Sequence, residues 1–393
     1  MLEYDPFDRL TAHNPFPVYQ RLRDEAPAYY SEKHDFWALS RYEDVVAGHL
    51  APEIYSSAQG VTLEGQDRGL PFLIVKDPPE HSFHRKVAMR MFTPRRVNQL
   101  AAFVRETAGR LLDEVVGRDS FDVVHEFSFR LPLDVISELV GIPVALRERV
   151  HLLSDRLAHR GEDGSISEDA RNASIELLGM FSELIAERRR NPGDDVMSLL
   201  MTTPVEEPDG STRLLDDGEL TLRLMELAFA GHETVARMIP NGVVALCWYP
   251  EQRRELVADP GLIPNAVEEM LRWDPPSHYQ GRWSTRDIPL HGTVIPKDSR
   301  VILITGAAVH DERKYPDPEV FDIHREIDRH VAFGFGRHLC LGAPLARLEL
   351  RIAFEELLKR FPDFGMDESG ITRVYNSNVR GLATLPLVVA KDG

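Results

Sequence analysis

The sequence predicts a mainly α-helical protein with a small β part. Long segments carry apolar residues three and four positions apart, whereas the β-branched runs are few and short. The 393 residues are 43% apolar, which is enough for a sizeable core. Pro and Gly are scattered and mark no clean boundary. We therefore expect a single domain over residues 1–393.

The helical periodicity recurs along most of the chain. Residues 94–117 end at Gly117, a residue typical of helix ends. The longest segment, residues 217–249, contains Pro240-Asn-Gly242, and we expect a kink or partial break there because an interior proline costs about 3 kcal/mol. The other predicted helices cover residues 122–141, 168–190, 262–273 and 343–361.

The β part is expected near the two ends of the chain. Strands are predicted at residues 34–39, 299–305 and 383–390, and polar loops at 159–168 and 204–218. The β-richer subregion should comprise approximately residues 28–75, 280–305 and 370–393. The helical subregion should comprise approximately residues 76–275 and 303–361.

Charge and composition exclude several function classes. The 46 Lys+Arg against 63 Asp+Glu give a net charge of −17, whereas nucleic-acid binding needs a basic face. Two cysteines, Cys247 and Cys340, are too few for a disulfide scaffold or a cysteine-rich zinc module. No apolar stretch approaches the ~18 residues of a membrane span, and no signal peptide is visible. We expect a cytoplasmic monomer.

The most informative segment is residues 333–342, Phe-Gly-Phe-Gly-Arg-His-Leu-Cys-Leu-Gly. Gly334, Gly336 and Gly342 permit backbone conformations closed to other residues. Cys340 precedes a predicted helix, whose N-terminal N–H groups and dipole favour a thiolate. A lone cysteine is usually a small buried apolar residue. A zinc site lacks a second ligand at suitable spacing, and a dinucleotide loop lacks its third glycine. Haem iron fits, because it needs only one protein ligand here.

A second informative segment, Ala230-Gly231-His232-Glu233-Thr234, lies within the longest predicted helix. A glycine in mid-helix costs about 1 kcal/mol relative to alanine, which suggests a local distortion or a close neighbour. Without other context, Thr234 would return its hydroxyl to the carbonyl of Ala230. Glu233 would likewise pair with Arg237 at i+4.

Together the two segments resemble the haem-binding and oxygen-binding motifs of the cytochrome P-450 monooxygenases. The first matches at Phe333, Gly336, Arg337 or His338, Cys340 and Gly342, and the second is complete for the pattern A-G-x-(D/E)-T. The resemblance covers nearly the whole chain and is to the soluble bacterial members. It implies the cytochrome P-450 fold, with the long helix over haem b and the Cys340 loop beneath. Cys340 would be the axial thiolate ligand.

The resemblance also implies roles for other residues. Thr234 and Glu233 would guide protons during oxygen activation, and Arg237 would orient Glu233. The expected haem contacts are His81, Arg85, Ala230, Gly231, Arg282, Phe333, Gly334, His338 and Gly342, of which His81, Arg85, Arg282 and His338 would hold the propionates. Glu269 and Arg272, with Arg325, would form a buried triad that fixes the Cys340 loop; considered alone, they are an ordinary surface ion pair.

The expected substrate contacts are mixed apolar and polar. They are Phe72, Leu73, Glu226, Phe229, His278, Tyr279, Asn378 and Val379. This mixture favours hydroxylation or epoxidation of a secondary-metabolite intermediate, polyketide or macrolide-like, as in antibiotic biosynthesis; a fatty acid or steroid is the alternative. Glu226 shares a helix face with Ala230 and Thr234, where the family usually has an apolar residue. It either pairs with Arg223 or anchors an amine or hydroxyl of the substrate.

Electrons are expected from a ferredoxin and its reductase, with O2 as co-substrate. Because partner ferredoxins are acidic, we expect a local basic patch near Cys340. Its members would be Arg85, Arg90, Arg95, Arg96, Arg337, Arg347 and Arg351. Alternatives are an enzyme that uses peroxide or catalyses another reaction such as C–C coupling, and a non-enzymatic haem-binding sensor or carrier.

Overall fold

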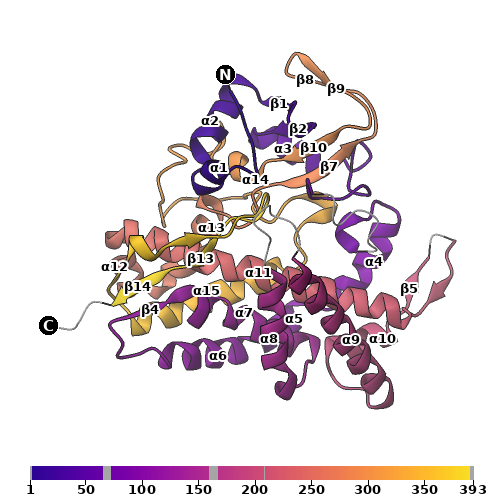
Figure 1. Cartoon of the computed structure of the whole chain (residues 1–393), viewed down its shortest axis with the longest axis vertical. Coiled ribbons are helices and arrows are strands. Elements are labelled where there is room, and N and C mark those ends of the chain that lie inside the picture. Colours follow the sequence, from indigo (N-terminus) through magenta and orange to yellow (C-terminus); the bar gives the residue numbers. More distant parts are fainter. Residues whose placement is uncertain (1, 65–71, 159–166, 208, 390–393) are drawn as a thin grey trace.

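The computed structural model describes residues 2–64, 72–158, 167–207 and 209–389. Figure 1 shows a β-containing part, formed by the N-terminal segment and residues near 280–305, above a larger helical part. The helix α11, Asp217–Trp248, runs through the helical part. This arrangement confirms the predicted fold class of mainly helical structure with small sheets.

The β-containing part is built on a five-stranded sheet with the order β1-β2-β10-β7-β3. Strand β10 pairs in parallel with β2 and antiparallel with β7. The strands are β1 Ala28–Ser31, β2 Phe36–Leu39, β3 Tyr55–Ser56, β7 Gln280–Ser284 and β10 Arg300–Leu303, with the hairpin β8 Ile288–Leu290 and β9 Thr293–Ile295 beside them. The helices of this part are α1 Arg9–His13, α2 Phe16–Glu25, α3 Tyr42–Leu50 and α14 Thr305–Ala308.

The helical part packs around α11, which contacts α7, α9, α13 and α15. Its helices are α4 Glu80–Met89, α5 Pro94–Gln99, α6 Ala101–Asp113, α7 Arg130–Val140, α8 Val144–Ala158, α9 Glu168–Arg190, α10 Val196–Thr202, α12 Pro250–Ala258, α13 Ile263–Trp273 and α15 Ala343–Arg360. A π-helical turn, η2 Val124–Ser128, precedes α7. The 3-10 turns are η1 Leu73–Val75, η3 Pro260–Leu262, η4 Gly336–His338 and η5 Glu368–Gly370.

Short strands complete the structure. A three-stranded sheet has the order β11-β14-β4, and two further pairs are β12 with β13 and β5 with β6. These strands are β4 Ser120–Asp122, β5 Val205–Glu206, β6 Thr212–Arg213, β11 Phe364–Met366, β12 Thr372–Arg373, β13 Leu382–Thr384 and β14 Pro386–Val389. Among the described residues, no helix is long and apolar enough to cross a membrane.

Helix α11 begins with a reciprocal cap and continues through its proline. The Asp216 carboxylate accepts from the Glu219 N–H at 2.8 Å, and the Glu219 carboxylate accepts from the Asp216 N–H at 3.0 Å. Of the kink or partial break predicted at Pro240, the break is absent, because α11 is continuous through that residue. Residues 235–246 are all buried, so packing against the surrounding helices outweighs the local cost of the proline.

Other boundaries also differ from the prediction. The segment 94–117 is divided into α5 and α6, and the segment 122–141 contains η2 before α7. The predicted loop 204–218 contains the β5–β6 hairpin and the start of α11. Most of the other predicted loop, residues 159–166, lies outside the described residues. The helices α1, α2, α3, α8, α10, α12 and α14 were not predicted.

Gly242 allows three helices to meet. A Cβ at this position of α11 would lie 2.5 Å from Cζ of Phe354 on α15 and 2.8 Å from Sδ of Met270 on α13. Both neighbours are buried in the main core. The absence of a side chain at Gly242 therefore sets how closely α13 and α15 approach α11, and these two helices flank the Cys340 loop.

We predict that Gly242→Ala destabilises the protein by about 1–2 kcal/mol, because overpacking in the core outweighs the gain in helix propensity. The matched control is Gly179→Ala in α9, where nothing lies within 4 Å of the added Cβ. The control should be neutral or slightly stabilising. Thermal unfolding followed by circular dichroism measures both; equal effects of the two substitutions would contradict the packing argument.

Candidate functional site

The Cys340 loop is closed by a backbone hydrogen bond. The Cys340 N–H donates to the Phe333 carbonyl at 2.8 Å, and η4 lies between them. Gly334 and Gly336 have φ values of +70° and +65°, and a Cβ on Gly336 would lie 2.9 Å from the His49 carbonyl oxygen. Only glycine fits there. For Gly342 the expected unusual conformation is wrong, because its φ is −83°.

The Cys340 thiol lies at the N-terminus of α15 beside an open space. The residue is exposed, and nothing lies within 4 Å of the position that a Cβ of Gly342 would take. Burial by the surrounding protein nevertheless raises the pKa of the thiol above its usual value, while the N–H groups of Gly342 and Ala343 and the Arg85 guanidinium act in the opposite direction. The N–H groups at the start of α15 favour the thiolate, as the sequence predicts, but the opposing effect of burial is larger. A bound metal ion would supply the missing positive charge.

Donor side chains from three elements converge beside this loop, as predicted. The His81 ring on α4 lies 4.2 Å from the His338 ring, measured between centroids. Arg85, also on α4, donates to the Leu339 carbonyl at 2.5 Å. Arg282 on β7 lies within hydrogen-bond distance of a residue that sequence reasoning missed, His49 on α3, with 3.4 Å between Nη2 and Nδ1.

These donors have no anionic partner of their own. Within the described residues, none of His81, Arg85, Arg282 and His338 forms an ion pair, and neither ring nitrogen of His81 has a hydrogen-bond partner. Burial lowers the pKa of Arg282 to about 10, that of His81 to about 4 and that of His338 to about 2. Buried cations and donors without a counter-charge are costly. The set therefore fits a ligand that carries carboxylates.

The motif residues of α11 have the local contacts that their residue types alone suggest. Thr234 Oγ donates to the Ala230 carbonyl at a long 3.4 Å, and Glu233 lies 3.9 Å from Arg237. Arg237 donates to the Leu382 carbonyl at 2.9 Å, which anchors it between α11 and β13. A Cβ on Gly231 would lie 2.7 Å from Cδ1 of Ile136 on α7. Gly231 therefore serves helix packing, whichever ligand it also contacts.

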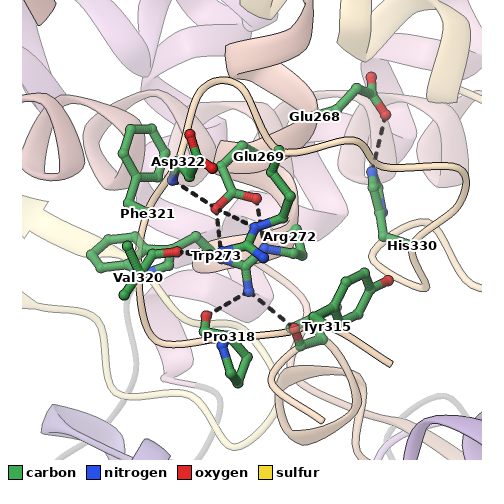
Figure 2. A network of polar contacts seen from close by, with 12 residues as sticks. Glu268, Glu269, Arg272, Trp273, Tyr315, Pro318, Val320, Phe321, Asp322 and His330 are labelled. Carbon is green, nitrogen blue, oxygen red and sulfur yellow. Dashed lines mark hydrogen bonds and ion pairs between the residues drawn. The ribbon is translucent and has the colours of Figure 1, made fainter. Parts of the chain in front are cut away.

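The structure brings Glu269, Arg272 and Arg325 together, with the first two buried and Arg325 partly exposed. Arg272 donates to both Glu269 oxygens at 2.6 and 2.7 Å, and neither side chain is exposed. Figure 2 shows this pair facing each other, with the Pro318 and Val320 carbonyls beside the guanidinium. Arg325 adds a contact to Glu269 at 3.2 Å. The triad thus fixes the segment that leads into the Cys340 loop.

A second carboxylate of the same helix, Glu268, was missed. It accepts two hydrogen bonds from Arg347 at 2.6 and 2.9 Å and lies 3.1 Å from His330 (Figure 2 shows the histidine). Burial would raise the pKa of Glu268, but His330 and Arg347 hold it at about 2. The Arg347 guanidinium lies 4.6 Å from the Phe333 ring centroid. Glu268 therefore holds both sides of the Cys340 loop.

The expected substrate segments 277–280 and 376–379 lie side by side. Ser277 bridges to Val379, and the His278 N–H donates to the Asn378 carbonyl at 2.7 Å. The His278 and Tyr279 side chains, however, are 4% and 0% exposed. They contact Tyr19 at 3.0 Å and Ser377 at 2.6 Å respectively. This burial argues against their expected contacts with a substrate.

The other expected substrate residues lie in two places. Leu73 is buried in η1, and Phe72 precedes that turn and is half-buried. Glu226 pairs with Arg223 at 2.5 Å, which favours the first of the two interpretations of this residue. The Phe229 side chain lies outside the described part of the chain.

Breaking the triad should strongly destabilise the protein. Glu269→Gln leaves Arg272 and Arg325 buried without a counter-charge, and we expect a loss of about 3–5 kcal/mol in the free energy of unfolding. The control is Glu25→Gln, which removes an exposed bidentate pair with Arg21 and should leave the melting temperature unchanged. Denaturant unfolding measures both. A loss for Glu269→Gln no larger than that for the control would contradict the structural role.

Comparison with known proteins shows the family. The cytochrome P450 family model matches residues 261–387. Cytochrome P450 123 of Mycobacterium tuberculosis is 40% identical over 396 residues, covering 99% of this chain and 97% of the relative. The vitamin D(3) 25-hydroxylase of Pseudonocardia autotrophica is 36% identical over 397 residues, covering 98% and 96%.

A solved structure agrees along the whole chain. The bacillaene polyketide synthase cytochrome P450 PksS of Bacillus subtilis superposes with a TM-score of 0.89 at 34% identity, covering 99% of this chain and 100% of that chain. The Cys340 loop, the buried donors beside it and these similarities lead to one conclusion. The chain belongs to the cytochrome P450 family of monooxygenases, whose haem is held by a cysteine thiolate.

Proposed function

We propose that this protein is a monooxygenase that inserts one oxygen atom from O2 into a C–H or C=C bond, with Cys340 as the thiolate ligand of haem b. The observation that carries the proposal is the convergence of Cys340 with four donors that have no counter-charge, of which His81 and Arg282 are buried. When bound, the haem supplies the activation of O2. His81, Arg85, Arg282 and His338 would bind its two propionates, which supply the missing negative charge.

The loop residues would hold the sulfur in place. The Cys340 N–H is committed to the Phe333 carbonyl, and the N–H groups of Gly342 and Ala343 are directed at the sulfur and stabilise its negative charge. Phe333 is held from outside by Arg347, which Glu268 orients. Cys340 is thus positioned by backbone and neighbouring contacts that do not involve its own side chain.

Protons would reach the site along α11. The Glu233 side chain is 30% exposed, so its carboxylate can take a proton from solvent. The Arg237 guanidinium, 3.9 Å away, holds this carboxylate beside α11. Thr234 is one residue further along, and its long bond to Ala230 leaves the hydroxyl free to donate elsewhere. The intact acid–alcohol pair argues against an enzyme that uses only peroxide.

The substrate is proposed to be a polyketide or macrolide-like intermediate of medium or large size. The similarity to PksS, which is named for polyketide biosynthesis, supports this class. The similarity to the vitamin D(3) 25-hydroxylase supports the steroid alternative. Optical binding titrations with a macrolactone and a secosteroid distinguish the two.

The electron donors are proposed to be a ferredoxin and its reductase, as is general for bacterial members of the family. The basic docking patch is narrower than the sequence suggests. Arg347 is committed to Glu268, and Arg351 and Arg96 lie 3.8 and 3.7 Å from Glu355 and Asp194. Among the seven predicted members of the patch, the exposed ones that form no ion pair in the described part of the chain are Arg90, Arg95 and Arg337.

Replacing Thr234 should uncouple NADH consumption from product formation. With a ferredoxin, its reductase and a compound that the wild type oxidises, Thr234→Ala should lower product formed per NADH at least tenfold and raise H2O2 correspondingly, because proton delivery is impaired. The control is Thr221→Ala, since Thr221 also bonds the carbonyl four residues earlier in α11, at 2.7 Å. Unchanged coupling in Thr234→Ala would contradict the assigned role, and NADH turnover itself separates an enzyme from a sensor.

A further inference from the structure

Glu226 connects α11 to a segment that is remote in sequence. Its Oε1 accepts a hydrogen bond from the Ile74 N–H at 3.2 Å, and its Oε2 accepts one from Arg223 at 2.5 Å. The Glu226 side chain is 16% exposed and that of Arg223 is 9% exposed. Both carboxylate oxygens therefore already accept a hydrogen bond from the protein.

The contacts continue from Arg223 onto α4. Its Nη2 lies 3.2 Å from Nδ1 of His84, and Nε2 of His84 lies 3.9 Å from Glu80. Because the guanidinium can only donate, Nδ1 of His84 accepts and its proton is on Nε2, toward Glu80. Glu80 in turn pairs with Lys76, at the end of the segment that Ile74 belongs to. The chain of contacts thus joins α11, α4 and residues 72–76.

The Ile74 N–H depends on this contact. In η1 the N–H groups of Val75 and Lys76 bond to Phe72 and Leu73, whereas the first N–H groups of such a turn have no partner within it. Leu73 and Val75 are 7% and 6% exposed, so the turn is anchored on one face by packing. On its other side the turn has a polar contact to the carboxylate of Glu226.

We propose that Glu226 is a positioning residue for substrate binding: it holds the turn Leu73–Val75 against α11 and thereby sets the position of Phe72 and Leu73 at the pocket wall. The inference rests on the proposed function and on the sequence-based expectation that Phe72 and Leu73 contact the substrate. The same helix carries Thr234 two turns later. Helix α11 therefore positions both the turn Leu73–Val75 and Thr234.

Hydrogen exchange of the haem-loaded enzyme tests the contact directly. Glu226→Asp keeps the charge beside Arg223 but shortens the reach to Ile74, and Glu226→Leu removes both contacts. In both variants the amides of a peptide covering residues 72–79 should exchange at least tenfold faster than in the wild type. A peptide covering residues 333–342 should be unchanged. The control is Glu80→Gln at the exposed end of the chain of contacts, which should alter exchange less than threefold.

Two azole probes report the consequence for the pocket. Both azoles would bind at the haem, and 4-phenylimidazole would reach further from it because it carries an additional phenyl ring. We expect Glu226→Asp to raise the Kd of 4-phenylimidazole at least fivefold and that of imidazole less than twofold, both read from the Soret shift. Equal changes for the two azoles would overturn the assignment of the wall to this segment.

The outcomes separate the inference from the proposed function. Wild-type exchange in Glu226→Asp, in protein with a normal carbon monoxide spectrum, would overturn the inference and leave the proposed function intact. Acceleration by Glu80→Gln equal to that of Glu226→Asp would also overturn it, because the turn would then be held through Lys76. If the leucine variant fails to fold, the aspartate variant decides. A wild type that forms no haem–thiolate species would overturn the proposed function.

Discussion

The buried ion pair between Glu269 and Arg272 determines where the Cys340 loop can lie. Neither side chain is exposed, so the cost of removing both charges from water must be offset by well-directed hydrogen bonds. Arg272 supplies them by donating to the carbonyls of Val309, Pro318 and Val320. The segment that carries these carbonyls is thereby held against α13. The next carboxylate of α13, Glu268, holds the flanks of the loop itself, so one helix turn places the whole loop.

The carboxylates that hold the Cys340 loop, Glu268 and Glu269, form a rigid frame whose charges differ from those of the donors beside Cys340. The frame carries carboxylates that are fully paired, whereas the open space beside Cys340 faces donors and cations that are not. Such an arrangement is unfavourable by itself and becomes favourable when an anionic ligand binds. Helix α11 holds Glu226 and Glu233 through neighbouring arginines, Arg223 and Arg237. Each acid thus has a defined position along one continuous helix.

The success of sequence reasoning depended on how local each feature is. The Cys340 loop and the acid–alcohol pair are contiguous motifs, and Glu269 and Arg272 are three residues apart, so all were predictable. The contacts of Glu268 with Arg347, of Ile74 with Glu226 and of His49 with Arg282 join residues 79, 152 and 233 positions apart. No local pattern announces them. Local sequence also does not show how deeply a residue is buried. Burial raises the pKa of Cys340 against the effect of the helix terminus. Packing keeps α11 continuous through Pro240, and His278 is enclosed by the protein.

The most direct test of this account is the carbon monoxide difference spectrum of the dithionite-reduced protein, recorded beside that of Cys340→Ser. Thiolate ligation by Cys340 predicts a strongly red-shifted Soret band in the wild type that is absent from the variant. The donors around the loop should still retain haem in the variant, so the shift can be lost without loss of the pigment. A wild-type spectrum like that of a histidine-ligated protein, or a red-shifted band that persists in Cys340→Ser, would contradict the account.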